Sequence, residues 1–75
     1  MPDIFIESIY RGIGERIAAR RQEWLVSQAA LATMTHLPIG RIEMGLEKVS
    51  VTGLFTIAHA LRCPVAWFLP ESEQG

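Results

Sequence analysis

Apolar positions recur at helical intervals along most of the chain. Near the N-terminus, three isoleucines stand four residues apart and so form one stripe of a helix: Ile9, Ile13 and Ile17. This stripe predicts a first helix from Ser8 to Trp24. Gly12 and Gly14 lower its helix propensity, so its N-terminal part either frays or begins only after Gly14. Residues 1–8 hold an apolar run too short to classify, either a short strand or an extension of this helix.

Two short helices are predicted in the middle of the chain. Ser27 is a good N-cap for a helix from Gln28 to Met34, which turns Leu31 and Ala32 toward the core. The next helix contains Pro38, which a helix tolerates only in its first turn, so it must begin near residue 36 or 37. We expect Thr35 to cap it. It should end at Met44, followed by Gly45 in a left-handed conformation, with two residues on its inner edge: Ile39 and Ile42.

The last third of the chain predicts two further helices. Ser50 or Thr52 can cap a helix from Val51 to Leu61, whose apolar residues share one face: Leu54, Ile57, Ala58 and Leu61. Pro64 suits the first position of a fifth helix that reaches Leu69. Because no segment reads as a core strand, we predict an all-α bundle of five short helices.

The composition predicts one small domain with apolar surface left over. The chain has 75 residues, of which 49% are hydrophobic and only 20% charged. We expect an N-terminal extension at 1–8, the domain at 9–70 and an acidic tail at 71–75, with the spare apolar surface covered by a partner or a second subunit. No apolar run is long enough to span a bilayer, and no signal-peptide pattern is seen. With the single Cys63, these features predict a reduced, cytoplasmic protein without a membrane association.

The charge distribution favours a local basic face over a broadly basic surface. The formal net charge is −1, and four of the basic residues gather in the first third of the chain: Arg11, Arg16, Arg20 and Arg21. Nucleic-acid binding would therefore depend on where these charges lie in the fold and not on their sum.

Four blocks, in this order and spacing, resemble the lambda-repressor-like Cro/CI family of helix-turn-helix DNA-binding domains, also called the Xre family. The blocks are GERIAARR at 14–21, SQAALA at 27–32, IGRIEMG at 39–45 and LFTIAHALRCPVAWFL at 54–69. The resemblance implies a five-helix bundle with a helix-turn-helix at residues 27–45, a partner in double-stranded DNA, and a homodimer.

The resemblance also implies roles for single residues. Gln28 falls where family members hydrogen-bond the DNA backbone or a base edge, and Lys48 falls where they reach a phosphate. Arg21 and Glu43 fall on a pair that ties the first helix to the third, a structural role. Ser27 is a cap that can also bond a phosphate.

The recognition helix departs from the family pattern because it is shorter by about one turn, roughly 5 Å. Pro38 and Gly40 bring no side-chain donor to the positions that usually face base edges. The remaining candidates for reading DNA are Thr35, His36 and Arg41.

Other chemistry is not indicated by the sequence. His36 and His59 lack companion ligands at metal-binding spacing, and Cys63 is expected to be a small core residue. No nucleophile-base arrangement or glycine-rich phosphate loop is present. We therefore predict no catalysis, cofactor, metal or small-molecule ligand.

The excess of apolar residues suggests two dimer surfaces. In the family, the region of Trp67, Leu69 and Pro70 often forms the two-fold contact, and core capping is the alternative role for these residues. A second candidate surface combines two apolar groups of residues: Trp24 and Leu25 with Ile4, Phe5 and Ile6.

The main hypothesis is a sequence-specific transcriptional regulator, expected to be a repressor, that binds a two-fold symmetric operator as a homodimer. The alternative is a protein-interaction module on the same fold, in which the shortened helix reads DNA weakly or not at all.

Overall fold

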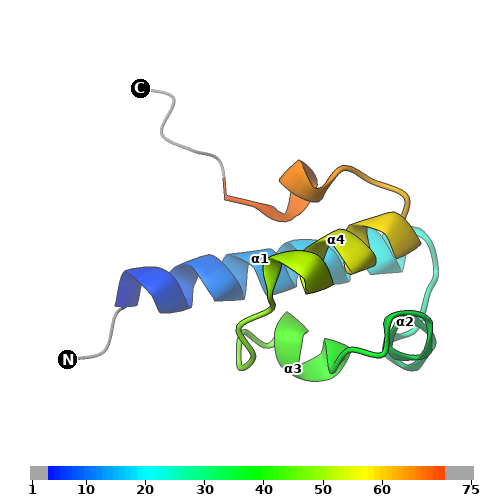
Figure 1. Cartoon of the computed structure of the whole chain (residues 1–75), viewed down its shortest axis with the longest axis horizontal. Helices are drawn as coiled ribbons and strands as arrows, with labels where there is room; N and C mark the ends of the chain where they lie inside the picture. The colour runs from blue at the N-terminus through cyan, green and yellow to red at the C-terminus, as the bar shows by residue number, and fades with distance from the viewer. Residues whose placement is uncertain (1–3, 71–75) are drawn as a thin grey trace.

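The structure, a computed structural model, describes residues 4–70 and is built from helices. In chain order they are α1 (Ile4–Glu23), α2 (Gln28–Thr35), α3 (Ile39–Glu43), α4 (Val51–Ala60) and the 3₁₀ helix η1 (Val65–Phe68) (Figure 1). Within this described range there is no strand, so the predicted all-α class is confirmed.

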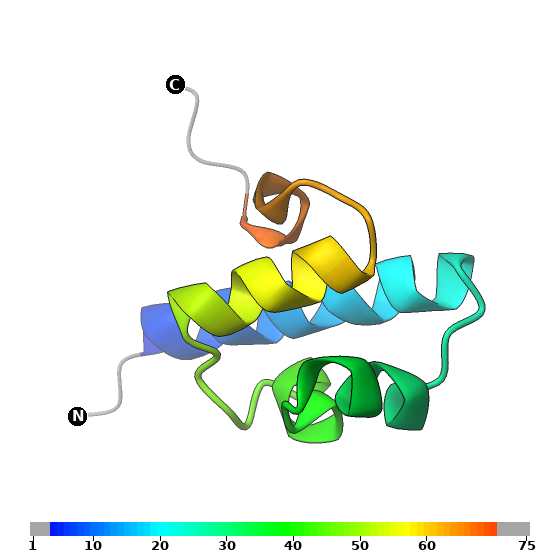
Figure 2. The same ribbon diagram turned by 45° about the vertical axis from the view of Figure 1, so that its right-hand side comes forward.

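The helices are arranged in three layers. Both ribbon views place α1 and α4 in the middle, α2 and α3 on one side of them, and η1 on the other side (Figures 1 and 2). α1 contacts α3 and η1, α2 contacts α3 and α4, and η1 also contacts α4. A five-residue helix such as α3 is too short to be stable alone, so its position depends on these contacts.

The core consists of the apolar faces predicted from helical spacing, with a few additions. Phe68 is almost fully buried, whereas its neighbour Trp67 is exposed. Ile9, Ala32 and Cys63 are partly buried against the core. The buried apolar residues are Ile13, Ile17, Leu31, Ile39, Ile42, Val49, Leu54, Ile57, Ala58, Leu61 and Phe68.

α1 begins earlier than the predicted Ser8 and runs without a break through both glycines. Residues 4–8 therefore extend this helix and do not form a strand, and residues 1–3 lie outside the described part of the chain. Gly14 is buried where α1 crosses the end of α3, and a Cβ there would come within 2.7 Å of the Glu43 carbonyl oxygen and still closer to that of Ile42. The close approach of two backbones requires glycine at this position.

The start of α3 was predicted incorrectly. Thr35 is the last residue of α2 and does not cap α3, because its buried hydroxyl donates a 2.8 Å hydrogen bond to the Leu31 carbonyl. His36 then ends α2 with a left-handed conformation, φ 60°. Pro38 precedes the first helical residue, Ile39, so α3 is even shorter than expected.

The predicted fifth α-helix is a 3₁₀ helix of four residues. The Trp67 N–H donates to the Pro64 carbonyl at 3.0 Å, an i to i+3 bond of the tighter helix. One such turn is enough to insert Phe68 into the core between α1 and α4.

Serine caps and left-handed residues define the helix ends. Ser27 accepts a hydrogen bond of 3.0 Å from the Ala30 N–H, as predicted for this cap. Of the two candidate caps for α4, Ser50 is the one used, and it accepts a hydrogen bond of 3.0 Å from the Gly53 N–H. Gly45 ends α3 at φ 76°, also as predicted. The helices within residues 4–70 are each too short or too polar to cross a membrane.

Candidate nucleic-acid interface

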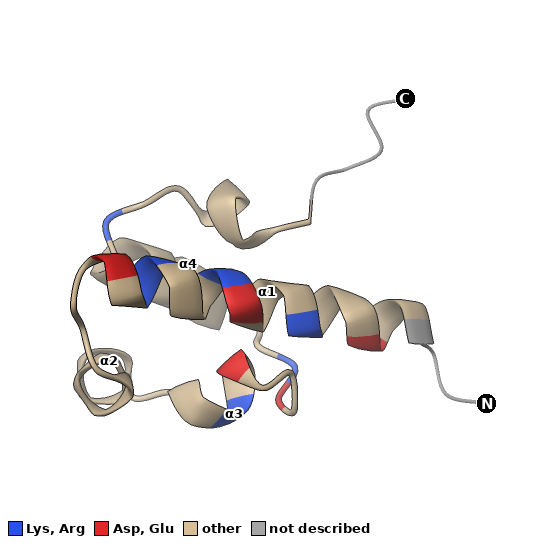
Figure 3. Cartoon of the chain, turned by 180° about the vertical axis from the view of Figure 1, so that it is seen from behind, with Lys and Arg blue, Asp and Glu red and all other residues tan. Residues whose placement is uncertain are grey.

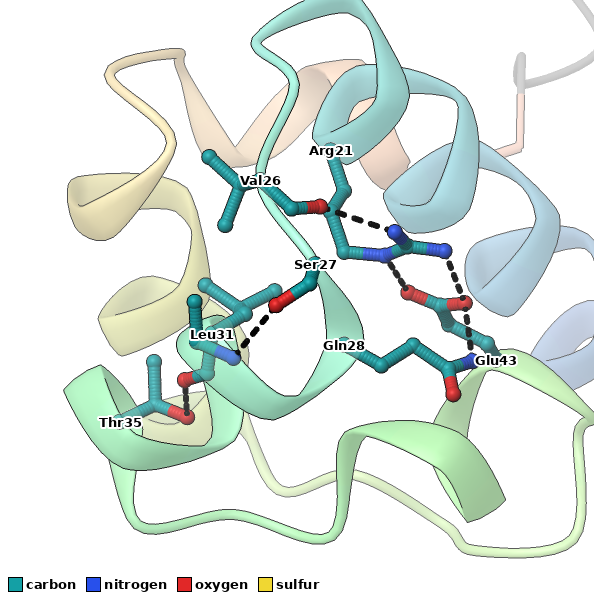
Figure 4. A network of polar contacts seen from close by, with 8 residues as sticks. Arg21, Val26, Ser27, Gln28, Leu31, Thr35 and Glu43 are labelled. Atoms are coloured by element: carbon teal, nitrogen blue, oxygen red, sulfur yellow. Dashed lines mark hydrogen bonds and ion pairs between the residues drawn. The ribbon is translucent and has the colours of Figure 1, made fainter.

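Arg21 and Glu43 connect α1 to α3 through a two-point ion pair (Figure 4). The Arg21 Nε atom donates to Glu43 Oε2 at 2.6 Å, and Nη2 donates to Oε1 at 3.0 Å. The remaining terminal nitrogen donates to the Val26 carbonyl at 2.9 Å, just before α2. The hydrogen bond to Glu43 raises the pKa of Arg21 above its ordinary value. The structure thus brings together the two residues for which the family resemblance implied a pair.

Gln28 joins this network from the first turn of α2. Its Nε2 atom donates to Glu43 Oε1 at 2.8 Å, so one carboxylate accepts hydrogen bonds from both α1 and α2 (Figure 4). Gln28 itself is exposed. The contact with Glu43 orients the amide and uses one of its two N–H groups.

Thr35 does not belong to the exposed surface of the helix-turn-helix. Its side chain is 7% exposed and its hydroxyl is hydrogen-bonded inside α2. The expectation that Thr35 contacts DNA is therefore wrong in this structure, because the residue faces the core. Ser27 and His36 are exposed.

Arg41 and Lys48 supply the positive charge near α3. Both residues are exposed, and Figure 3 shows that α2 carries no charged residue. Arg41 is not free of partners, because its Nε atom lies 3.2 Å from the Glu47 Oε1 atom in the following loop. Arg11 of α1, also exposed, lines the same hollow as Gly45 and Lys48. The electrostatic attraction of this surface for an anion therefore depends on few cations, one of which, Arg41, is paired.

Arg20 is a structural residue that the sequence analysis did not identify. Its guanidinium carbon lies 4.9 Å from the ring centres of both Trp24 and Trp67. Arg20 also donates hydrogen bonds of 3.0 Å to the carbonyls of Leu61 and Arg62 at the end of α4. The contact between Arg20 and Trp24 could have been predicted from their four-residue spacing in one helix. The contact between Arg20 and Trp67 could not, because the two residues are far apart in sequence.

Metal and thiol chemistry receive no support from the described residues. Within residues 4–70, no three His, Cys, Asp or Glu side chains are grouped so as to hold a metal ion. Cys63 is half-buried, and this burial raises the pKa of its thiol.

A capped helix, a three-residue turn and a short second helix braced by α1 define a helix-turn-helix domain. Comparison with known proteins gives the same class. No family model matches the chain. An uncharacterized transcriptional regulator in the ATPase CF(0) region of Rhodospirillum rubrum is 30% identical over 84% of the chain. The chain spans 61% of the length of that relative.

Solved structures with similar folds include regulators and part of an enzyme. The restriction-modification controller protein C.AhdI from Aeromonas hydrophila matches with a TM-score of 0.76 and 25% identity, covering 80% of this chain and 96% of its own. The DNA-binding domain of BldD matches with a TM-score of 0.75 and 22% identity, covering 85% of this chain and 97% of its own. Hydroxypropylphosphonic acid epoxidase from S. wedmorenis matches with a TM-score of 0.79 and 25% identity, covering 85% of this chain but 36% of its own. These likenesses support a helix-turn-helix domain with a Cro/CI-like fold.

Proposed function

We propose that the chain is a DNA-binding transcriptional regulator that acts as a homodimer on a two-fold symmetric operator. The observation that carries the proposal is the Arg21–Glu43–Gln28 network, which fixes an exposed amide at the first turn of the helix-turn-helix. The names of two similar proteins agree with this function, since one is a transcriptional regulator and the other a DNA-binding domain.

In this proposal, α3 enters the major groove and the surrounding residues hold the phosphates. Gln28, His36 and Arg41 are the exposed polar side chains available for base edges. Ser27 and Lys48 contact phosphates, which position the domain without reading sequence. A dimer would place two such surfaces on half-sites about one helical turn apart, and repression would follow from occupancy of the promoter.

Catalysis is not part of the proposed function. The likeness to the epoxidase concerns 36% of that enzyme's chain, so most of the enzyme has no counterpart in this fold. The regulators, by contrast, match over nearly all of their solved chains.

Binding to DNA tests the proposal directly. Fluorescence anisotropy would compare the chain's own upstream region with a random duplex at two salt concentrations. We expect tighter binding to the upstream region and a loss of affinity as salt rises, because each neutralised phosphate releases counterions. Arg41→Ala and Gln28→Ala should each weaken specific binding by about tenfold, in line with roughly 1–3 kcal/mol for a base contact.

Arg16→Ala is the matched control, because it removes the same charge on the η1 side of the molecule, beside Trp67 and Phe68. Light scattering would check that it leaves the oligomeric state unchanged. Absence of binding to either duplex at low salt would rule out the regulator function. Equal binding to both duplexes, unchanged by Arg41→Ala, would rule out sequence-specific reading.

A protein-interaction module is the second candidate. It is favoured by large apolar side chains exposed near the helix-turn-helix: Met34, Met44 and Leu46. Failure of DNA binding would leave this function as the better account of the fold.

A further inference from the structure

We propose that Glu47 sets the DNA affinity of this domain by holding the Arg41 side chain in an ion pair that DNA must displace. This inference rests on the proposed function, because it assumes that the surface around α3 meets DNA. The pair joins Arg41 Nε to Glu47 Oε1 at 3.2 Å. Both side chains are accessible to a ligand, with 61% of Arg41 and 44% of Glu47 exposed.

The backbone after α3 brings Glu47 to Arg41. The Leu46 N–H donates to the Arg41 carbonyl at 2.9 Å, and the Gly45 N–H donates to the Ile42 carbonyl at 3.0 Å. Together with the left-handed Gly45, these bonds form a helix-ending motif that folds the chain back over the last turn. Glu47 follows this motif directly. Its position beside Arg41 is therefore set by the end of α3 and not only by flexible side chains.

Glu43, the other acid near Arg41 in sequence, is already engaged. Both of its carboxylate oxygens accept hydrogen bonds from Arg21, and one also accepts from Gln28. Glu47 is the acid that pairs with Arg41 in the described structure. The two carboxylates thus have separate roles, one bracing the helices and one neutralising the exposed cation.

Neutralising Arg41 removes a large share of the positive charge near α3, because few cations lie near this surface. Arg41 is the one basic residue of α2 and α3, and the other cations near it are Lys48 in the following loop and Arg11, which lies against Gly45. Pairing with Glu47 reduces the attraction of Arg41 for DNA. An exposed ion pair contributes only about 0–1 kcal/mol, so contact with DNA can displace the carboxylate. Glu47 therefore lowers the affinity without abolishing binding.

Glu47→Gln provides the test. We expect this variant to bind the upstream duplex about two- to fivefold more tightly at low salt, a range that corresponds to the strength of an exposed ion pair. Thermal unfolding followed by circular dichroism would confirm that the variant is folded.

Glu23→Gln is the matched control. It makes the same charge change in an exposed glutamate that pairs with an arginine, the mostly buried Arg20, at a distance of 3.4 Å beside Trp67 and away from α3. Because Arg20 also contacts Trp67, light scattering would check that Glu23→Gln keeps the oligomeric state of the unmodified chain. Equal gains in affinity from Glu23→Gln and Glu47→Gln would overturn the inference, because they would show a general effect of net charge.

The double variant Arg41→Ala/Glu47→Gln separates two routes. If Glu47 acts by holding Arg41, its replacement should have no effect once Arg41 is absent. A gain that persists in the double variant would overturn the inference in favour of direct repulsion between Glu47 and DNA.

If the unmodified chain binds no duplex at all, the proposed function fails and this inference fails with it. If it binds and Glu47→Gln changes nothing, only this inference fails.

Discussion

At the scale of single residues, Gly14 shows how a residue can oppose local structure and still be required by the fold. In a helix, glycine is less favourable than alanine by roughly 1 kcal/mol, which is why the sequence suggested a frayed start to the first helix. In the structure, α1 is continuous, and Gly14 lies against the last carbonyls of α3. Gly12 has no such neighbour, since a Cβ there would meet only the end of the flexible Arg16 side chain, at 2.8 Å from Nη1.

The two glycines should therefore respond in opposite ways to alanine. Gly14→Ala should lower the free energy of unfolding by about 2–3 kcal/mol, because the added methyl group overlaps backbone atoms that cannot move aside easily. Gly12→Ala should raise it by about 0.5–1 kcal/mol through helix propensity. Urea unfolding followed by circular dichroism measures both, and a stabilised Gly14→Ala variant would contradict the close approach of α1 and α3.

At the scale of helices, the helix-turn-helix is held in place by polar contacts as well as by its buried face. α3 has five residues and buries two of them, Ile39 and Ile42. Its last residue, Glu43, has a side chain that is only 6% exposed and is bonded to both α1 and α2. The hydrogen bond with Glu43 raises the pKa of Arg21 in the folded chain above that of an ordinary arginine. The stabilisation that this hydrogen bond gives is therefore complete below the ordinary arginine pKa, and it is lost only as pH rises through the higher pKa of the folded chain. Arg21 therefore stays ionised throughout the neutral range.

Removing one partner of the Arg21–Glu43 ion pair should destabilise the domain more than removing both partners. Glu43→Ala should lower the free energy of unfolding by about 2–3 kcal/mol, because it leaves the partly buried Arg21 without its partner. Arg21→Met/Glu43→Ala should recover part of this loss, because no unpaired charge remains. Urea titration of the two single variants and the double variant gives the coupling energy. Additive effects would mean that the pair contributes no coupling to the position of α3.

At the scale of the whole molecule, the exposed apolar residues do not form the second of the two surfaces expected from sequence. Phe5 and Trp24 are near opposite ends of α1, about 28 Å apart at 1.5 Å per residue, so they cannot belong to one compact surface. Trp24 instead lies close to Trp67, with Arg20 in contact with both rings. We define the tryptophan patch as Arg20, Trp24 and Trp67, and propose that it forms the dimer contact together with the exposed Leu69 and Pro70.

Oligomeric state distinguishes this patch from the other end of α1. We expect light scattering to show a dimer at high micromolar concentration, and Leu69→Glu to convert it to a monomer by placing a charge in the contact. Phe5→Glu is the matched control, since it adds the same charge to an exposed apolar position far from the patch. A monomer in the unmodified chain would refute the dimer, and dissociation by Phe5→Glu alone would move the contact to the other end of α1.

Interactions between residues close in sequence were the part that could be predicted. Helical spacing indicated the buried faces, and the short-range chemistry of Ser27 and Gly45 indicated a cap and a helix end, because each depends on bonds within one turn. The Arg21–Glu43 pair followed from a family resemblance and not from spacing.

Contacts between distant segments were decided only by the folded chain. The close approach of α1 to α3 explains Gly14, the burial of Thr35 removes a candidate DNA contact, and the fold brings Arg20 to Trp67. The pairing of Glu47 with Arg41 also depends on how the chain turns after α3. Periodicity specifies which side of a helix is buried, but it does not specify which backbone or charge lies opposite, because that depends on how the helices pack against one another.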